Sequence, residues 1–315
     1  MSRTIPAVPA AASPVSAQRG FLLLITAGVL WGTGGLAGHL LQDVSGVPSL
    51  AVATYRLLLG GLLITAFLGV SGRLRRLPLT RPLLARLVLN GVLHAVFQSL
   101  YFASLALVPV GLATFVKIGS VPVFVAIGIC LGSRSLPARR LVVSVLLAVA
   151  GLALLAGFPG ADASPARLAA GLGCSLGAGL VFSLMTLANR KPVAGLDPLV
   201  NVGLGLLVGG VLLAPAGAAA GLAVPADALS LGLLAFLALV PTALAYLAFF
   251  GGLRTASDTA AAVGGITEPL TAAVLSMVLL GEQMTALGAV GSALLVAAMG
   301  SDAGARALER RRARG

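Results

Sequence analysis

Residues 259–280 read TAAAVGGITEPLTAAVLSMVLL, with Glu268 and Pro269 side by side near the middle. At 1.5 Å per helical residue, the run is about as long as the hydrocarbon core of a bilayer is thick. An ionised carboxylate in hydrocarbon normally faces a partner or a water-filled cavity, because its desolvation is costly. Proline removes one backbone donor, so we expect the helix to bend at Pro269. A charge and a bend at mid-depth indicate a site.

The rest of the chain has the same apolar character. Its 315 residues are 58% hydrophobic and only 10% charged, with a mean hydropathy of +1.06, whereas soluble domains carry roughly a quarter charged residues. Long apolar runs alternate with short polar breaks, which predicts an all-α membrane protein. The spans that we predict are 21–41, 50–70, 84–105, 110–131, 139–158, 168–188, 199–219, 228–250, 259–280 and 284–300.

The two ends of the chain are polar. Residues 1–19 are rich in Ala, Pro and Ser and predict a flexible tail. The first apolar run is too long for a signal peptide and has many successors, so we interpret it as an uncleaved span. Residues 301–315 form a basic tail that should meet anionic lipid head groups.

The distribution of Lys and Arg predicts the orientation. One side has both tails and most basic loop residues, namely Arg73, Arg75, Arg76, Arg81, Arg134, Arg139, Arg140, Arg190, Lys191 and Arg254. The opposite loops have only Arg167, together with Asp43, Asp162, Asp227 and Glu282. This bias predicts that both termini are cytoplasmic and that the number of spans is even. The pI of about 11.5 does not indicate nucleic-acid binding, because no basic face alternates with stacking aromatics.

An internal repeat divides the chain. Leu57–Leu63 reads LLLGGLL and Leu206–Leu212 reads LLVGGVL, while Val121-Pro122 corresponds to Glu268-Pro269. The ten spans therefore form two units of five, at 20–158 and 168–300. Because five is odd, the two units are inverted relative to each other. Inverted repeats are typical of secondary transporters, whose sites lie at the repeat interface near mid-depth.

These features resemble the drug/metabolite transporter superfamily, specifically its EamA-type ten-helix members. The residues that carry the resemblance are Trp31-Gly32, the arginine after Tyr55, Tyr101-Phe102-Ala103, Pro122, Glu268-Pro269 and Leu280-Gly281-Glu282. Two departures are Gly132-Ser133-Arg134-Ser135, where the family usually has Gly-Glu, and Lys117, where a small or apolar residue is more usual. The resemblance implies transport of a small solute, with family members moving amino acids, nucleotide-sugar-like metabolites and drugs.

Polar side chains from several spans share one slab of the membrane at ~1.5 Å per residue. They are Glu268, Lys117, His94, Gln98, Trp31 and Arg56, and we take them as candidates for solute binding or coupling. Each also has a structural interpretation. Glu268 and Lys117 would form a buried ion pair, Arg56 would cap carbonyls, His94 would be a satisfied core residue, and Trp31 would only pack. Pro122 and Pro269 are hinge candidates.

The sequence favours an exporter of amino-acid-like or drug-like metabolites in the plasma membrane, working by alternating access. It contains no catalytic pattern such as HExxH and no GxxxxGK[ST], so we predict neither an enzyme nor a bound cofactor. Cys130 and Cys174 lie in separate apolar runs, and no metal-ligand spacing occurs. A membrane-embedded enzyme and a non-transporting scaffold or sensor are the alternatives. The expected partners are a small solute and the lipid bilayer, with a homodimer left open.

Overall fold

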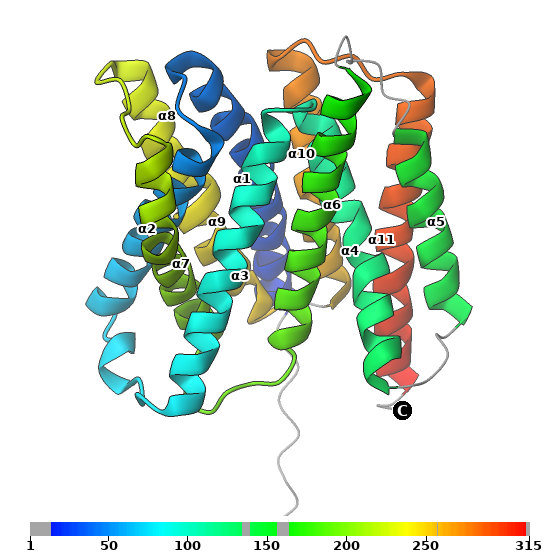
Figure 1. Cartoon of the computed structure of the whole chain (residues 1–315). Helices are drawn as coiled ribbons and strands as arrows, with labels where there is room; N and C mark the ends of the chain where they lie inside the picture. The colour runs from blue at the N-terminus through cyan, green and yellow to red at the C-terminus, as the bar shows by residue number, and fades with distance from the viewer. Residues whose placement is uncertain (1–13, 134–138, 156–163, 257, 313–315) are drawn as a thin grey trace, which may run out of the picture.

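A computed structural model describes residues 14–133, 139–155, 164–256 and 258–312. The described residues form a bundle of helices without a strand (Figure 1). The elements are α1 (Pro14–Ser45), α2 (Ser49–Val70), the 3₁₀ helix η1 (Arg73–Arg76), α3 (Arg81–Leu105), α4 (Val110–Ser133), α5 (Arg139–Leu155), α6 (Pro165–Ala188), α7 (Pro198–Ala220), α8 (Ala228–Ala238), the π-helical turn η2 (Leu239–Leu244), α9 (Ala245–Leu253), α10 (Asp258–Leu279) and α11 (Ala286–Arg312).

Helices cover the predicted apolar runs. In the part of the chain that the structure describes, seven are long and apolar enough to cross a membrane, and the eighth run counts among these as one segment through α8, η2 and α9. Three apolar segments are shorter, at Val142–Gly151, Val263–Leu279 and Ala286–Gly300. Side chains such as Leu62, Val70 and Leu131 are exposed on the outside of the bundle. These exposed apolar side chains fit a lipid surrounding.

Two helices extend into the predicted tails. Helix α1 begins at Pro14, so residues 14–19 are helical, and α11 continues to Arg312. Proline fits the first turn of a helix, and the run ARALERRR after Gly304 has good helix propensity throughout. Residues 1–13 and 313–315, the end of the fifth predicted span after Leu155, and Arg134-Ser135 lie outside the described residues.

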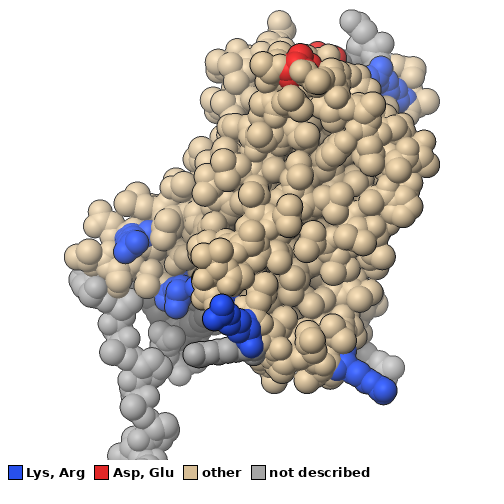
Figure 2. All heavy atoms as spheres, turned by 90° about the vertical axis from the view of Figure 1, so that its left-hand side faces the viewer, with Lys and Arg blue, Asp and Glu red and all other residues tan. Residues whose placement is uncertain are grey.

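The start of α1 and the end of α11 lie at the same end of the bundle (Figure 1). This basic end, as we call it, also has η1 and the α6–α7 and α9–α10 connections, with the exposed residues Arg73, Arg75, Arg190, Lys191 and Arg254. The other end, the acidic end, has Asp43, Asp227 and Glu282. Figure 2 shows most of the visible Lys and Arg at one end and the visible Asp and Glu at the other.

One glycine of each repeated pair packs against the backbone of the other helix. A Cβ on Gly61 of α2 would lie 2.5 Å from the backbone nitrogen of Leu207 in α7. Reciprocally, a Cβ on Gly210 of α7 would lie 2.7 Å from the backbone nitrogen of Leu58 in α2. Only glycine permits backbones this close. The repeated sequence therefore forms a reciprocal crossing between α2 and α7.

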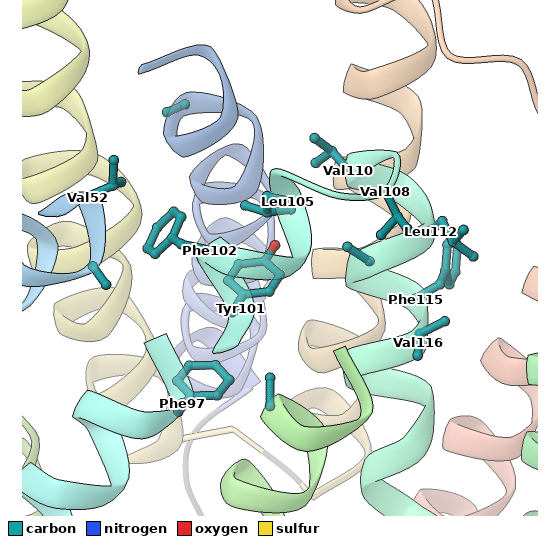
Figure 3. Packing of buried hydrophobic residues seen from close by; sticks show 14 of the residues in the cluster. Val52, Phe97, Tyr101, Phe102, Leu105, Val108, Val110, Leu112, Phe115 and Val116 are labelled. Atoms are coloured by element: carbon teal, nitrogen blue, oxygen red, sulfur yellow. The ribbon is translucent and has the colours of Figure 1, made fainter. Parts of the chain in front are cut away.

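The core is densest where α3 turns into α4 (Figure 3). Phe102, Leu105, Leu112 and Phe115 are almost fully buried there. Glu282, in the turn after α10, fixes the start of α4, because its carboxylate accepts from the backbone N–H groups of Val110 at 2.6 Å and Gly111 at 3.1 Å.

Asp227 caps α8 in the same way at the acidic end. Its carboxylate accepts from the backbone N–H groups of Leu229 at 3.0 Å and Ser230 at 2.9 Å. The hydrogen bond from the Ser230 backbone is the largest cause that lowers the pKa of Asp227 below its ordinary value. The positive end of the α8 helix dipole stabilises the charged carboxylate of this cap.

The helices that contain Pro122 and Pro269, α4 and α10, are not interrupted at these prolines, and the bend expected at Pro269 stays a prediction. The departure from α-helical geometry occurs instead at η2, which contains Pro241. A π-helical turn inside a longer helix is frequent at functional sites, and polar partners surround this one.

Candidate functional site

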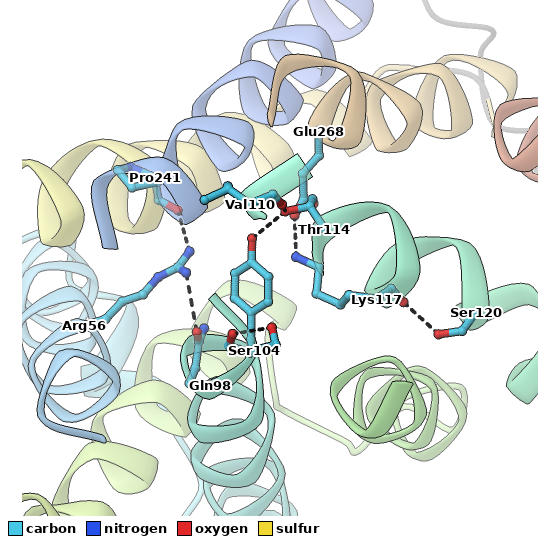
Figure 4. Close-up of polar contacts among 10 residues, drawn as sticks. Arg56, Gln98, Ser104, Val110, Thr114, Lys117, Ser120, Pro241 and Glu268 are labelled. Atoms are coloured by element: carbon cyan, nitrogen blue, oxygen red, sulfur yellow. Dashed lines mark hydrogen bonds and ion pairs between the residues drawn. The ribbon is translucent and has the colours of Figure 1, made fainter. Parts of the chain in front are cut away.

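An ion pair joins α4 to α10 inside the bundle (Figure 4). The Nζ atom of Lys117 lies 2.8 Å from Oε1 of Glu268, and the two side chains are 6% and 20% exposed. Lys117 and Glu268 therefore form the buried ion pair that the sequence analysis gave as their structural interpretation. The ion pair is compatible with a role in solute binding, because a charged group of a solute can replace either partner.

Aromatic rings of α3 cover the other side of the Lys117 ammonium. Its Nζ lies 3.9 Å from the centre of the Tyr101 ring and 5.8 Å from that of Phe97. The Tyr101 hydroxyl shares a hydrogen bond of 2.8 Å with Thr114, whose hydroxyl also donates to the Val110 carbonyl. Cation–π contact stabilises a desolvated ammonium, so Tyr101 is part of the site. Sequence reasoning used Tyr101 only as a family residue, although it follows Gln98 by three positions.

Arg56 of α2 is the second buried cation. It is 7% exposed, and it donates from Nε to the Thr242 hydroxyl at 3.1 Å, from one terminal nitrogen to Gln98 at 3.4 Å, and from the other to the Pro241 carbonyl at 3.3 Å. The Phe102 ring lies 5.7 Å away. All these partners are neutral, and no carboxylate of the described residues pairs with Arg56. The expected carbonyl contact is present, and the charge remains uncompensated.

Pro241 explains the π-helical turn. A proline cannot donate to the carbonyl four residues earlier and its ring crowds that carbonyl. Here that carbonyl belongs to Leu237, and the Thr242 hydroxyl donates to it at 2.8 Å. The same hydroxyl accepts from Arg56. Thr242 thus links the guanidinium to the turn, a role that sequence reasoning missed although the Pro-Thr pair in mid-span was a usable signal.

One face of α3 is polar along most of its length, with Asn90, His94, Gln98 and Tyr101 spaced by a helical turn. His94 is 2% exposed, and its Nδ1 has no hydrogen-bond partner among the described residues. A Cβ on Gly205 of α7 would lie 3.5 Å from Cδ2 of the imidazole, an ordinary van der Waals contact, so α7 packs directly against His94. The predicted candidates His94 and Gln98 do share a face.

Toward the basic end, this face meets a cluster of asparagines. The amide nitrogen of Asn90 donates to Asn189 at 3.2 Å and to Asn201 at 3.0 Å, and Asn189 donates back to Asn90 at 2.8 Å. Arg86 donates to the Ala188 carbonyl and to Asn189. The cluster joins α3 to the end of α6 and the start of α7. Sequence reasoning missed it, since no local pattern relates these three positions.

Trp31 of α1 lies against α9, with ring centroids 5.4 Å from Tyr246 and 4.9 Å from Phe249. Trp31 therefore makes aromatic packing contacts, as its structural interpretation expects. One turn on, a Cβ on Gly34 would lie 3.3 Å from a terminal nitrogen of Arg56. The backbone of α1 thus packs closely against the guanidinium, and only a glycine fits there without displacing a neighbour. In the described part of the chain, no three His, Cys, Asp or Glu side chains group as metal ligands.

A model of the EamA-like transporter family matches the chain twice, at residues 18–157 and 169–300. The chain belongs to the EamA-like transporter family. The resemblance inferred from sequence is confirmed, and the two matches correspond to the two predicted units. Membership makes the protein a multi-pass membrane transporter, as its apolar helices also indicate.

Bacterial relatives of the EamA-like chain are also named as transporters. It is 28% identical over 276 residues to the uncharacterized transporter YwfM of Bacillus subtilis (strain 168), covering 87% of this chain and 90% of the relative. It is 23% identical over 286 residues to the uncharacterized inner membrane transporter YicL of Salmonella typhimurium (strain LT2), covering 90% and 95%.

A solved crystal structure has the same fold as this EamA-like chain. The TM-score is 0.62 at 19% sequence identity, over 95% of this chain and 99% of the other. At this level of identity the likeness concerns the fold alone. The near-complete coverage shows that the arrangement of helices is shared from end to end.

Proposed function

We propose that this EamA-like protein is a secondary transporter that exports small amino-acid-like or drug-like metabolites across the plasma membrane by alternating access. In this proposal all ten apolar segments span the membrane, as two inverted units of five. The three shorter segments, in α5, α10 and α11, pack on the same bundle as the seven longer ones. The double match to the family model supports the two units.

The reciprocal crossing of Gly61 and Gly210 supports the inverted relation. Gly61 lies against the backbone of Leu207, which precedes the glycine pair of α7, and Gly210 lies against that of Leu58, which precedes the glycine pair of α2. Exchanging α2 and α7 therefore exchanges the two contacts. Such an exchange is what a pseudo-two-fold axis in the membrane plane produces. The axis would pass between the halves, close to the buried cations.

The Lys117–Glu268 pair carries the proposal for the site. It connects the fourth span to the ninth, one from each unit, and both charges lie inside the bundle. An amphoteric solute would replace the pair, since Lys117 attracts a carboxylate or phosphate and Glu268 attracts an amine or carries a proton. Alternating access needs such a site where the units meet.

The test begins with the solute. Metabolite profiling of the medium, with and without overexpression of the full chain, identifies the exported compounds. Flux of those compounds into liposomes is then measured for the wild type, Glu268→Gln, Lys117→Met and the double variant. We expect all three variants to lose most of the flux. Wild-type flux in all three would remove both residues from the mechanism, and no flux in the wild type would favour the scaffold or sensor.

The orientation is tested separately. The positive-inside rule places the basic end, with both chain ends, in the cytoplasm. Reporter fusions at residue 1 and at residue 315 should therefore both report a cytoplasmic location. Reporters on opposite sides of the membrane would contradict the even number of spans.

A further inference from the structure

The buried charges of the bundle do not balance. Arg56 and Lys117 are both buried cations, 7% and 5% exposed, and the structure gives them one carboxylate partner, Glu268. The Glu268 carboxylate is 2.8 Å from Lys117 and bonds to that residue. Among the described residues, Arg56 therefore has only neutral acceptors. An uncompensated charge inside an apolar bundle is costly, so this site favours an anion.

The guanidinium retains the means to bind one. A guanidinium has five N–H donors, and three of them serve Thr242, Gln98 and the Pro241 carbonyl. One donor on each terminal nitrogen remains. Arginine binds carboxylates with parallel N–H groups. On the side of α1, a Cβ on Gly34 would lie only 3.3 Å from a terminal nitrogen and 3.0 Å from Pro241, so the backbone of α1 packs closely there and an anion would approach from the side of Gln98.

His94 is an independent sign of a missing ligand. The residue is buried, with 2% of its surface exposed, and its Nδ1 makes no hydrogen bond in the described structure. Buried polar atoms without a partner are rare and call for an explanation. His94 lies one turn of α3 from Gln98, on the same face, and Gln98 contacts Arg56. The unpaired imidazole is thus next to the uncompensated cation.

We propose that Arg56, with Gln98 and His94, forms an anion subsite that takes the carboxylate of the transported solute, separate from the Lys117–Glu268 pair. The proposal rests on the proposed transport function and names a substrate class for it, monocarboxylates. One negative charge neutralises the excess at the centre, whereas a phosphate dianion would exceed it. A monocarboxylate without an amine leaves Glu268 bonded to Lys117. On an amphoteric solute the carboxylate would bind Arg56 in place of Lys117, and the amine would bind Glu268 and bring its own positive charge.

The structural alternative is that Arg56 only holds the π-helical turn. Arg167 offers a matched comparison, because it donates to the Ala106 carbonyl at 2.8 Å at the acidic end and has no part in the subsite. Gln98→Glu is the sharpest variant. It is nearly isosteric and keeps the acceptor for Arg56, but it supplies the missing negative charge from within the protein. If Arg56 only holds the π-helical turn, Gln98→Glu should bind an anion no more weakly than the wild type does.

The experiment uses the purified full chain in lipid nanodiscs and two probes, acetate and chloride, each titrated to about 100 mM at constant ionic strength in a HEPES salt. The chain has one tryptophan, Trp31, which contacts Tyr246 one turn after the π-helical turn. Its emission is the binding signal. A rise in Tm with ligand is the second readout, by mass action.

We expect acetate to change the emission saturably in the wild type and in Arg167→Gln. Arg56→Gln and Gln98→Glu should weaken acetate binding by about tenfold or more, and His94→Phe by less, since it removes one neutral group. Gln98→Glu should not lower the Tm of the unliganded protein, which keeps the test valid if Arg56→Gln fails to fold.

Three results would overturn the subsite: no saturable change with acetate in the wild type, wild-type acetate binding in Gln98→Glu, or saturation with chloride but not acetate. Chloride alone would make the ligand an inorganic ion. Equilibrium binding does not depend on flux. Acetate binding without flux of any profiled solute would contradict the transport proposal only, and flux without acetate binding would contradict the subsite only.

Discussion

The Lys117 ammonium lies 3.9 Å from the centre of the Tyr101 ring. Because Oε1 of Glu268 is 2.8 Å from the same nitrogen, the charge is held by a carboxylate from α10 and by a ring from α3. Two separate helices thus contact the same ammonium. A solute that takes the carboxylate leaves Lys117 with the ring, which keeps the cation inside the bundle while Glu268 is engaged elsewhere.

The ion pair predicts unequal effects of single and double substitution. Lys117→Met or Glu268→Leu leaves one buried partner without its counterpart, which costs about 3 kcal/mol or more when a pair is buried. Lys117→Met with Glu268→Leu removes both charges and should recover most of that stability. Unfolding in lipid–detergent micelles measures the three variants. Additive losses in the double variant would contradict a coupled pair.

The π-helical turn predicts a specific role for the Thr242 hydroxyl. Thr242→Val removes the donor to the Leu237 carbonyl and the acceptor for Arg56, and leaving buried partners unsatisfied costs about 1–3 kcal/mol. Thr242→Ser keeps the hydroxyl and should stay close to wild type. Thr186→Val is the matched control, because that hydroxyl is exposed and only donates to the Phe182 carbonyl. Equal unfolding free energies for the two valine variants would contradict this role.

The cap on α4 predicts a smaller effect. The backbone N–H groups of Val110 and Gly111 donate to different oxygens of Glu282, so Glu282→Gln keeps one acceptor, turns an NH2 donor toward the other N–H, and loses the charge, which strengthens such bonds roughly twofold. We expect a loss of about 1 kcal/mol in unfolding free energy. The neighbouring Gln283→Ala, at an exposed position, should change the stability little. A larger loss for Gln283→Ala would mean that the turn, and not the cap, fixes α4.

The contact between α1 and α10 predicts that two glycines respond oppositely to alanine. A Cβ on Gly32 would lie 2.5 Å from the Thr271 side chain and 2.8 Å from the Glu268 carbonyl oxygen. Overpacking of this kind typically costs about 1–3 kcal/mol. A Cβ on Gly265 meets nothing within 4 Å, so alanine there should stabilise α10 by about 0.4–1 kcal/mol. Unfolding curves of Gly32→Ala and Gly265→Ala test both signs. A stable Gly32→Ala would contradict the close approach.

Local sequence predicted the features that depend on composition and spacing. Apolar runs gave the helices, and the heights of Lys117 and Glu268 along their spans placed them within reach of each other. In each case the information lies within one helix or one turn.

Contacts between distant segments could not be predicted in this way. Asn90, Asn189 and Asn201 meet only after α3, α6 and α7 pack together. Pro241 was not distinguished from Pro122 and Pro269, because the sequence does not show which carbonyl a proline leaves unpaired or whether a hydroxyl such as that of Thr242 replaces the lost donor. The missing carboxylate beside Arg56 is likewise a property of the assembled bundle.

The asparagine cluster has a consequence for how the basic end can part. Asn90 and Asn189 each bond to more than one neighbour, so moving α3 away from α6 and α7 disrupts several amide contacts together. Asn90 is buried, whereas Asn189 is exposed and Asn201 is half-buried, so water reaches the last two before it reaches Asn90. A small separation therefore leaves the Asn90 amide short of partners, which is less stable than either a complete network or contact with water. In the proposed transport, a solute moving along the polar face of α3 would pass Asn90 only once the helices are far enough apart for water to enter.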